Sequence, residues 1–419
     1  MEGPKSKSRR EFVKAAAITG GVVLGAPLFI PKRSEAAETL TIGVNEELTG
    51  VYAYPAKNEV RGMQMAVDDW NKKGGVIGRQ LKLLVEDNAN NPGTAVEKAR
   101  KLFEVDKVPV LIGTLNSANS QAVSNVAFQA GRPFLVSGGH TDSVTGAQCH
   151  WTTFRTCHST WAETHATGLS ISKKFGKKWY YITPDYAFGH SLLDGYKDME
   201  AKLGVQVVGS DLTPLGTTDF SAYLTKVLAA KPDCLIIMVQ GDDQINCLKQ
   251  ANSFGILKRI PVAGPQGELE PLWGVPKEAQ VGYWGVEWYY KNVGNNKEAQ
   301  SFVSRYMAQF QEPPTARSAF GYITVERMAT AIQEAKGTDP VKVCKQLSGM
   351  TFHPLQQGTG TYRAVDHQLT WPMLFCETIA GGQSDNPKDI FKMVDVQPGE
   401  AIEHPVSEQE KICKLTWPA

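Results

Sequence analysis

The stretch Trp70-Asn71-Lys72-Lys73-Gly74-Gly75-Val76-Ile77-Gly78-Arg79-Gln80-Leu81-Lys82-Leu83 marks the end of one predicted helix and the beginning of a predicted strand. Residues 59–71 carry apolar side chains on one face at helical spacing, and the two glycines follow the last turn, where glycine commonly ends a helix. Residues 81–87 are predicted to form a strand, and residues 40–44 upstream read as a buried strand. The stretch therefore completes a strand–helix–strand unit.

The same alternation extends along most of the chain. We expect a first series with strands at 40–44, 81–87, 108–113 and 133–138 and helices at 59–71, 94–105 and 118–130. We expect a second series with strands at 179–183, 205–210 and 234–239 and helices at 191–202, 220–230 and 244–254. Such alternation predicts parallel sheets with helices on both faces, so the fold class is α/β with two doubly wound lobes. Two helices, at 298–310 and 318–336, and a hairpin, at 373–379 and 390–396, complete the prediction.

Composition and charge narrow the functional classes. The 419 residues include 44 Lys and Arg against 43 Asp and Glu, for a formal charge of +1. A nucleic-acid-binding protein would need a basic face, so no nucleic-acid partner is expected. Apolar residues at 42% and charged residues at 21% are typical of a folded globular chain rather than a disordered one.

Residues 1–36 are predicted to be an export signal. Residues 1–14 are polar and basic, and the uncharged run 15–30 is too short for a comfortable membrane span. The pair Arg9-Arg10 resembles a twin-arginine motif, with an accidental pair in an ordinary secretory signal as the alternative. Cleavage after Ala36 would leave 383 residues with a formal charge of −3. We expect a periplasmic monomer without a direct membrane anchor.

Seven cysteines in an exported chain predict disulfides. Cys149 and Cys157 bracket a short loop, and we expect them to be paired with each other. Their spacing is not that of a zinc knuckle, so no zinc is expected there. The sequence leaves five cysteines without an assigned partner: Cys234, Cys247, Cys344, Cys376 and Cys413.

No enzyme motif is present in the sequence, and no catalytic residue, metal site or cofactor is expected. Cys157, His158 and His165 could be read as a nucleophile and a base, but isolated residues of these types are more often structural. The predicted carboxyl ends of the strands are rich in hydroxyl residues, glycine and aromatics. Open parallel sheets bind ligands at these ends, so the pattern favours a small polar ligand.

The stretch 70–83, followed by Glu86-Asp87-Asn88, resembles the branched-chain-amino-acid type of periplasmic solute-binding protein, which feeds an ABC importer. Leu48-Thr49-Gly50 and Asp185-Tyr186-Ala187-Phe188-Gly189 also match in order, and the match extends over residues 39 to about 397. The resemblance implies a type I fold, with two lobes joined by three crossovers, and a membrane permease as partner. We expect lobe 1 to comprise 39–154 plus 288–370 and lobe 2 to comprise 155–287 plus 371–419.

The resemblance also implies ligand contacts in the first lobe. Ser117 matches the serine that holds a ligand carboxylate, although it could serve only as a helix cap. Gly139 and Thr141 match positions that contact the head group of an amino acid, with a purely structural turn as the alternative. Tyr54 lies in the loop where an aromatic residue covers the ligand. His140 departs from the small apolar residue expected between Gly139 and Thr141.

In the second lobe, Tyr186 and Phe188 match positions that offer an aromatic ring, with packing at the lobe surface as the alternative. Asp243, with Asp242 as the alternative, falls at the acidic position that pairs with a ligand ammonium, although Asp is also favoured at a helix start. Asp243 thus favours an amino acid, branched-chain or other, whereas the aromatic loops favour a larger or aromatic acid. The sequence leaves one alternative function open, a sensory or regulatory binding module of the same fold that detects an amide or an amino acid. An enzyme is not expected.

Overall fold

The computed structural model describes residues 38–382 and 386–418. The predicted export signal, with Arg9-Arg10, lies outside these residues. The strands are β1 (Thr39–Glu46), β2 (Gln80–Asp87), β3 (Leu111–Gly113), β4 (Phe134–Val136), β5 (Thr153–Arg155), β6 (Lys178–Pro184), β7 (Gln206–Thr213), β8 (Cys234–Ile237), β9 (Val262–Gly264), β10 (Tyr283–Val286), β11 (Thr351–Phe352), β12 (Gly360–Tyr362), β13 (Leu369–Thr370), β14 (Met373–Thr378) and β15 (Phe391–Gln397).

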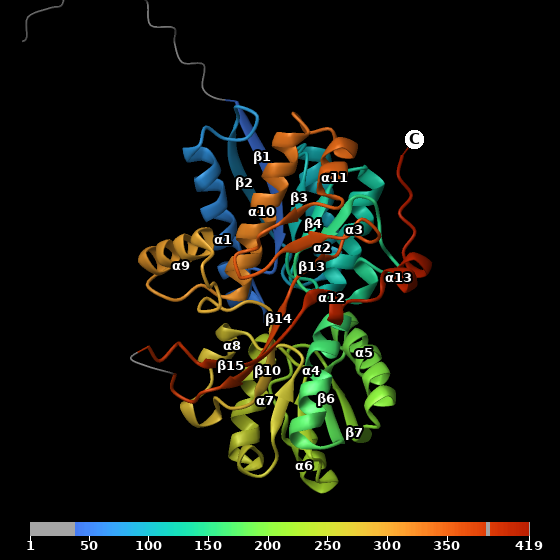
Figure 1. The fold of residues 1–419 in the computed structure, drawn as a ribbon, viewed down its shortest axis with the longest axis vertical. Coiled ribbons are helices and arrows are strands. Elements are labelled where there is room, and N and C mark those ends of the chain that lie inside the picture. Colours follow the sequence, from blue (N-terminus) through green and yellow to red (C-terminus); the bar gives the residue numbers. More distant parts are fainter. Residues whose placement is uncertain (1–37, 383–385, 419) are drawn as a thin grey trace, which may run out of the picture. The chain divides into compact units, whose positions relative to one another are not determined.

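The α-helices are α1 (Ala53–Lys72), α2 (Pro92–Arg100), α3 (Ser117–Ala130), α4 (Thr160–Phe175), α5 (Ala187–Leu203), α6 (Ser221–Ala230), α7 (Gly241–Ser253), α8 (Leu269–Trp273), α9 (Lys297–Phe310), α10 (Ala316–Glu334), α11 (Pro340–Leu347), α12 (Gly399–Ile402) and α13 (Val406–Ile412). Short segments of other helix types lie at Lys101–Val105, Asp142–Val144, Ile256–Lys258 and Lys277–Ala279. Figure 1 shows how these elements follow one another along the chain. None of the helices in the described part of the chain is both long and apolar enough to span a membrane.

The first sheet has five parallel strands in the order β2-β1-β3-β4-β5. Successive strand residues point to opposite faces. Ile112 and Leu135 pack with α1 and α10 on one face, whereas Leu111 and Phe134 pack with α2 and α3 on the other. Both faces are therefore buried, as expected for a parallel sheet with helices on each side.

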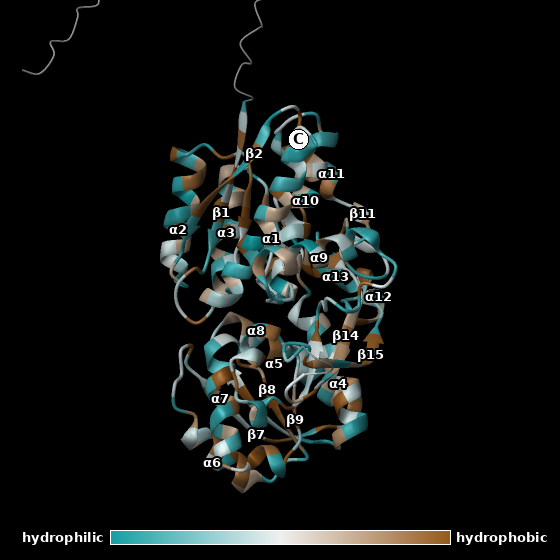
Figure 2. Ribbon diagram, turned by 90° about the vertical axis from the view of Figure 1, so that its left-hand side faces the viewer, coloured by the Kyte–Doolittle hydropathy of each residue, from teal (hydrophilic) through white to brown (hydrophobic). Residues whose placement is uncertain are grey.

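The second sheet has seven strands in the order β15-β14-β10-β9-β8-β6-β7. Its five strands from β6 to β10 run parallel. The predicted hairpin adds β14, which is antiparallel to β10, and β15, which is antiparallel to β14 and lies at the edge. Trp179 and Ile236 pack with α4 and α5, and Ile182 and Leu235 pack with α6 and α7. The hydrophobic residues of both sheets are visible as brown strands in Figure 2. The predicted α/β fold with two doubly wound lobes is confirmed.

Several elements between residues 255 and 370 were not predicted. Strands β9 and β10 have only three and four residues, and a third small sheet, β11-β12-β13, has strands of two or three residues. Strands this short carry too few alternating side chains for a reliable pattern. Helix α1 also begins six residues before the predicted start, because Pro55 lies in its first turn, where proline is tolerated.

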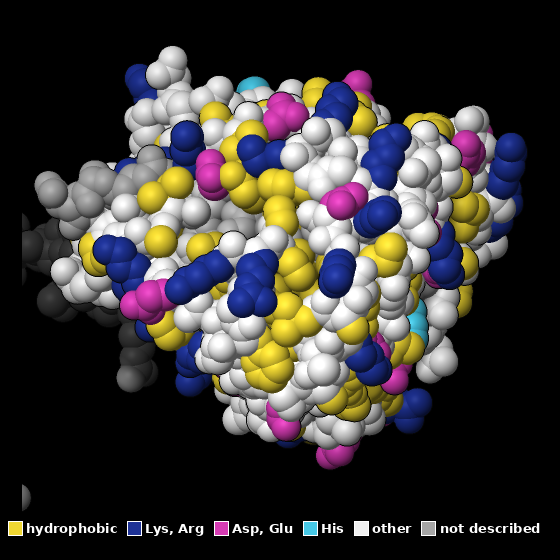
Figure 3. Space-filling model, turned by 90° about the horizontal axis from the view of Figure 1, so that it is seen from below, with side chains coloured by type: hydrophobic (Ala, Val, Ile, Leu, Met, Phe, Trp, Pro, Cys, Tyr) yellow, Lys and Arg dark blue, Asp and Glu magenta, His cyan; other side chains and the backbone are white. Residues whose placement is uncertain are grey.

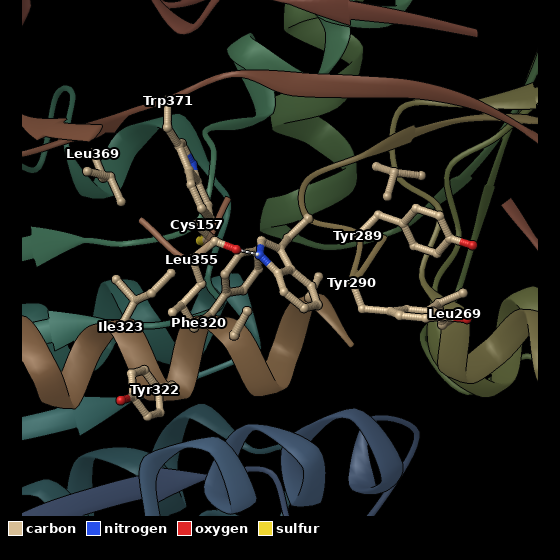
Figure 4. Packing of buried hydrophobic residues seen from close by; sticks show 14 of the residues in the cluster. Cys157, Leu269, Tyr289, Tyr290, Phe320, Tyr322, Ile323, Leu355, Leu369 and Trp371 are labelled. Atoms are coloured by element: carbon tan, nitrogen blue, oxygen red, sulfur yellow. Dashed lines mark hydrogen bonds between the residues drawn. The ribbon is translucent and has the colours of Figure 1, made fainter. Parts of the chain in front are cut away.

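The predicted disulfide between Cys149 and Cys157 is wrong. Cys149 is paired with Cys413, whereas Cys157 is a free, buried cysteine. The reason is that β5 extends between the two residues and carries Cys157 into the core, beside Leu355 and Trp371 (Figure 4). A strand separates its ends instead of bringing them together.

The segment after β15 contacts the first lobe, although we expected 371–419 to belong to the second. The Gln409 side chain donates to the Thr145 carbonyl at 2.7 Å, and the Trp417 ring lies 5.6 Å from the Trp151 ring. Helix α12, in contrast, packs on α4. The C-terminal segment therefore touches both lobes, and the disulfide at Cys413 fastens its end to the loop before β5.

Charged side chains of both signs are dispersed over the face of the molecule that is seen from below (Figure 3). Figure 3 shows Lys and Arg side chains scattered among acidic, apolar and other residues on the face seen from below. On this face, no continuous basic surface of the kind that tracks a nucleic-acid backbone is visible.

Candidate functional site

Loops at the carboxyl ends of both sheets enclose a small cavity of about 10 Å³. Its lining combines polar, aromatic and charged side chains from the two lobes: Tyr52, Leu115, Ser117, His140, Tyr186, Phe188, Gln240, Gln266, Glu268 and Arg317. A cavity of this size has room for about one water molecule. A larger hollow of about 600 Å³ lies beside Gly294 and His353, away from the strand ends. Another, of about 420 Å³, is lined by Thr141 and Asp142 after β4 and by Ala187 and His190 after β6.

Ser117 is the first residue of α3 and lines the cavity, as predicted from its place before a helix. Its Oγ accepts a hydrogen bond from the Thr141 amide at 3.2 Å, so its own hydrogen remains available as a donor. Thr141 lies behind Ser117 and is not part of the cavity lining. Gly139 is needed for close packing, because a Cβ atom there would collide with the Ser120 side chain.

The aromatic residue that covers the cavity from the first lobe is Tyr52 rather than Tyr54. The Tyr52 and Tyr186 hydroxyls are 2.7 Å apart and join the two lobes. Tyr54 is 41% exposed and donates to Glu312 at 3.2 Å, because its place in the first turn of α1 directs it away from the cavity. Phe188 lines the cavity beside His140, whose ring centroid is 5.8 Å from that of Phe188.

Asp243 lies in the first turn of α7 and does not line the cavity. Its Oδ2 accepts a hydrogen bond from the Gly216 amide at 2.9 Å, in a neighbouring loop of the same lobe. Burial raises the pKa of its carboxyl to about 6, against the effect of that hydrogen bond. The structure thus places the predicted ammonium partner outside the cavity.

The cavity instead contains a buried ion pair that links the lobes. Arg317, in the first turn of α10, donates from Nε to Glu268 Oε1 at 2.5 Å, and from a terminal nitrogen to the Gly138 carbonyl at 3.2 Å. Glu268 follows β9 in the second lobe. Burial raises the pKa of the Glu268 carboxyl, while the charge of Arg317 acts in the opposite direction.

Sequence reasoning missed this pair, although one signal was available. Arg317 is the only charged residue in the segment 313–325, which otherwise reads as the start of a buried helix. A lone arginine in such a segment needs a partner once it is buried. The partner itself, 49 positions away, follows a three-residue strand that was not predicted.

A second polar cluster lies next to the cavity. Glu287, just after β10, accepts from His140 Nε2 at 2.8 Å through one oxygen. Its other oxygen accepts from the backbone amide and Nδ1 of His158, at 2.7 and 3.0 Å. Glu163 of α4 lies 3.5 Å from His140 Nε2. Among the described residues, His140, Glu163 and Glu287 form a group whose nitrogen and oxygen atoms lie close enough to hold a metal ion.

A third buried carboxylate, that of Glu47, supports the first-lobe loops. It accepts hydrogen bonds from four donors: Leu115 N at 2.7 Å, Asn116 N at 3.2 Å, Asn119 Nδ2 at 2.7 Å and Asn88 Nδ2 at 3.1 Å. The Asn116 side chain also caps α3, through the Ala118 amide. The amides of Leu115, Asn116 and Ala118 are therefore bonded within the protein, whereas the Ser117 hydroxyl keeps its hydrogen available as a donor.

Residues 39–383 match the family model described as Periplasmic binding protein. The chain belongs to this family. It is 27% identical to a periplasmic binding protein from Burkholderia mallei, with a TM-score of 0.83, over 89% of this chain and 98% of that one. It is also 27% identical to an amino acid ABC transporter substrate-binding protein from Pseudomonas fluorescens Pf-5, with a TM-score of 0.80, over 91% of this chain and 100% of the other.

A curated relative, Leu/Ile/Val-binding protein homolog 7 of Brucella suis biovar 1 (strain 1330), is 25% identical over 349 residues, which cover 78% of this chain and 86% of the relative. The predicted resemblance to branched-chain-amino-acid-type binding proteins is confirmed, and so is the type I fold. This periplasmic binding protein is thus a small-ligand binding protein of the ABC-transporter type, with a cavity between its two lobes.

Proposed function

We propose that the protein captures an amino acid between its two lobes and delivers it to the permease of an ABC importer. The observation that carries this proposal is the presence of both charges, Arg317 and Glu268, in one cavity lined by the two lobes. A relative named for Leu, Ile and Val and a neighbour named for amino acids support the same ligand class.

The carboxylate of the ligand would bind Arg317 and Ser117. Arg317 offers a buried guanidinium, which binds carboxylates well because its donors match their geometry. The Ser117 hydroxyl is free to donate on the same side of the cavity. These two groups lie on α10 and α3, which pack in the first lobe, so the first lobe would hold the acidic end.

The ammonium of the ligand would bind Glu268 in the second lobe. In the structure Glu268 is bonded to Arg317, so each charge already has a partner across the cavity. A zwitterion inserted between them would replace one buried ion pair by two, and no charge would be left alone. A ligand with only a carboxylate would leave Glu268 buried without a partner, which is costly.

Binding would require the lobes to separate and close again. A cavity of about 10 Å³ cannot hold an amino acid, and the Tyr52–Tyr186 hydrogen bond and the Arg317–Glu268 pair hold the lobes together. Closing over a ligand is the hinge motion of two-lobed binding proteins. The side chain of the ligand would lie against Tyr186 and Phe188, which provide apolar area.

Calorimetry on residues 38–419 tests the proposal with two ligands, leucine and 4-methylpentanoate, its analogue without the amino group. We expect micromolar binding of leucine or another amino acid, which corresponds to about −8 kcal/mol. Glu268→Gln should weaken the binding of the amino acid by roughly ten- to a hundredfold, the range for a lost hydrogen bond to a charged group. It should leave the binding of the deaminated analogue unweakened.

Asp243→Asn is the matched control, because Asp243 is also a buried acid beside the second-lobe loops but does not line the cavity. We expect this variant to bind the amino acid like the wild type. An amino acid affinity that falls in Asp243→Asn and stays unchanged in Glu268→Gln would contradict the proposed orientation. Absence of binding for every amino acid would contradict the proposed ligand class.

We also propose that residues 1–36 direct export through the twin-arginine route, which supports the periplasmic location typical of the family. Replacement of Arg9 and Arg10 together by Lys should stop delivery to the periplasm. Unchanged delivery would contradict this route.

A further inference from the structure

Three buried side chains from distant parts of the sequence converge beside the cavity. His140 follows β4, Glu163 lies in the first turn of α4, and Glu287 follows β10. Their ligating atoms all lie within 4.8 Å of one another. His140 Nε2 is 2.8 Å from Glu287 Oε1 and 3.5 Å from Glu163 Oε1. Because these residues are 23 and 124 positions apart along the chain, they do not form a sequence motif.

Glu163 is the unusual member of the group. It is fully buried, and neither of its carboxylate oxygens has a hydrogen-bond partner among the described residues. A buried carboxylate without a partner is costly, so proteins normally provide one. Burial raises the pKa of Glu163 well above its usual value, with a further contribution from the nearby charge of Glu287.

The two nearby arginines do not provide that partner. Arg155 donates to the carbonyls of His140 and Thr141, the side chain of Gln368 and the hydroxyl of Thr145. Arg317 donates to Glu268 and to the Gly138 carbonyl. Both arginines act on Glu163 only through their charge, without a direct bond.

Glu287 is held in the way that metal-binding carboxylates usually are. His158 fixes one of its oxygens with two N–H groups, so the other oxygen points at His140. Supporting hydrogen bonds of this kind orient the groups that bind a metal. The Gln266 side-chain amide lies 3.0 Å from both His140 Nε2 and Glu287 Oε1, on the side of the cavity.

We propose that His140, Glu163 and Glu287 bind a divalent transition-metal ion of the Zn²⁺ type. One imidazole nitrogen and two carboxylate oxygens form a suitable ligand set for zinc. A tetrahedral zinc ion holds its ligand atoms about 3.3 Å apart, and the two separations from His140 Nε2 bracket that value. The ion would also neutralise the two carboxylates of the cluster.

The ion would lie beside the cavity, since His140 lines it. The three residues differ from those that we assign to the amino acid, which are Arg317, Ser117, Glu268, Tyr186 and Phe188. The metal site can therefore fail while the proposed function holds, and the reverse is also true. The competing explanation is a single proton shared between Glu163 and His140, which would satisfy both groups without any metal.

The experiment uses residues 38–419, freed of metal with EDTA and then titrated with Zn²⁺ alone by calorimetry. Elemental analysis after gel filtration gives the number of ions per chain. We expect one ion per chain, and a binding constant at least tenfold weaker in Glu163→Gln and in His140→Gln. The shared proton predicts no zinc, and this result would overturn the proposal.

Glu403→Gln is the matched control, because Glu403 is another buried acid, bonded to Ser159, and is not one of the three metal-binding residues. It should bind Zn²⁺ like the wild type. Thermal unfolding in EDTA checks folding, and Glu163→Gln should be about as stable as the wild type because the amide replaces a buried carboxyl group that makes no hydrogen bond to the described residues. Equal zinc affinity in Glu163→Gln and the wild type would overturn the proposal even with one ion bound.

Discussion

Glu47 and Glu163 are both fully buried, yet their surroundings differ completely. Glu47, at the end of the first sheet, accepts four hydrogen bonds from Asn88, Leu115, Asn116 and Asn119. Glu163, between the lobes, accepts none from the described residues and faces His140 and Glu287. Glu47 is a structural support, whereas Glu163 is available to bind a further group.

The comparison shows that burial of a charge does not by itself indicate function. Burial raises the pKa of both carboxyls, and the four hydrogen bonds at Glu47 act against this rise without reversing it. Arg317 and Glu268 are an intermediate case, since the two charges are bonded to each other across a cavity, and Arg317 also donates to the Gly138 carbonyl. Sites are therefore found where buried charges lack partners or share them across a gap.

The most direct test of the difference between Glu47 and Glu163 is to make the same substitution at both positions. Glu47→Gln should lower the free energy of unfolding by about 2–4 kcal/mol, because an amide NH₂ cannot accept the bonds that the carboxylate accepts and buried donors lose their partner. Glu163→Gln in metal-free protein should change it by less than about 1 kcal/mol or increase it. Urea unfolding in EDTA measures both variants, and equal losses would contradict the distinction.

Ser117→Ala tests whether the free hydroxyl at α3 faces the ligand. Loss of a hydrogen bond to a carboxylate costs about 1.5–3 kcal/mol, so we expect roughly ten- to a hundredfold weaker binding in calorimetry. Ser124→Ala is the control, because Ser124 is a buried serine of the same helix that is bonded to Thr153 and is remote from the cavity lining. Equal affinities for wild type and Ser117→Ala would remove Ser117 from the site.

His367 provides a test of how stability depends on pH. Burial lowers the pKa of its imidazole to about 3, from an ordinary value of 6.5. Because the unfolded chain takes up the proton first, this neutral histidine is fully stabilising above pH 6.5. Stability should fall by about 1.4 kcal/mol per pH unit as the pH drops from 6.5 towards 3.

The measurement is the difference in unfolding midpoint between wild type and His367→Gln at pH 7.5 and pH 5. At pH 5 the unfolding midpoint of the wild type should be equal to that of His367→Gln or lower. An unchanged difference would show that His367 is not held neutral. His367 Nδ1 donates to the Thr153 carbonyl, which carries no charge. It therefore contrasts with His140, which lies between two carboxylates.

Most of the fold could be predicted from the sequence because long elements repeat a pattern. Helix α3 and strand β6, for example, are long enough to be recognised, the strand as a continuous apolar run, and the stretch 70–83 joins two such elements. Strands β9 and β10 could not be predicted, since three or four residues carry no clear alternation. The partner of Cys149 could not be predicted either, because Cys413 lies 264 positions away in the sequence.

The site was predictable only where a residue has a fixed place at the end of a regular element. Ser117, Tyr186 and Phe188 meet this condition and line the cavity. Asp243 meets it as well, but its carboxylate turns to the Gly216 amide within its own lobe. Glu268 follows an unpredicted strand, and its bond to Arg317 depends on how the two lobes meet.

A crystal structure of residues 38–419 with the tightest-binding amino acid tests the central claim most directly. Our account predicts that the ligand lies between the lobes, with its carboxylate on Arg317 and the Ser117 hydroxyl and its ammonium on Glu268. In that state the direct bond between Arg317 and Glu268 should be replaced by bonds to the ligand. A ligand whose ammonium contacts Asp243, or one bound outside this cavity while Arg317 and Glu268 remain paired, would contradict the account.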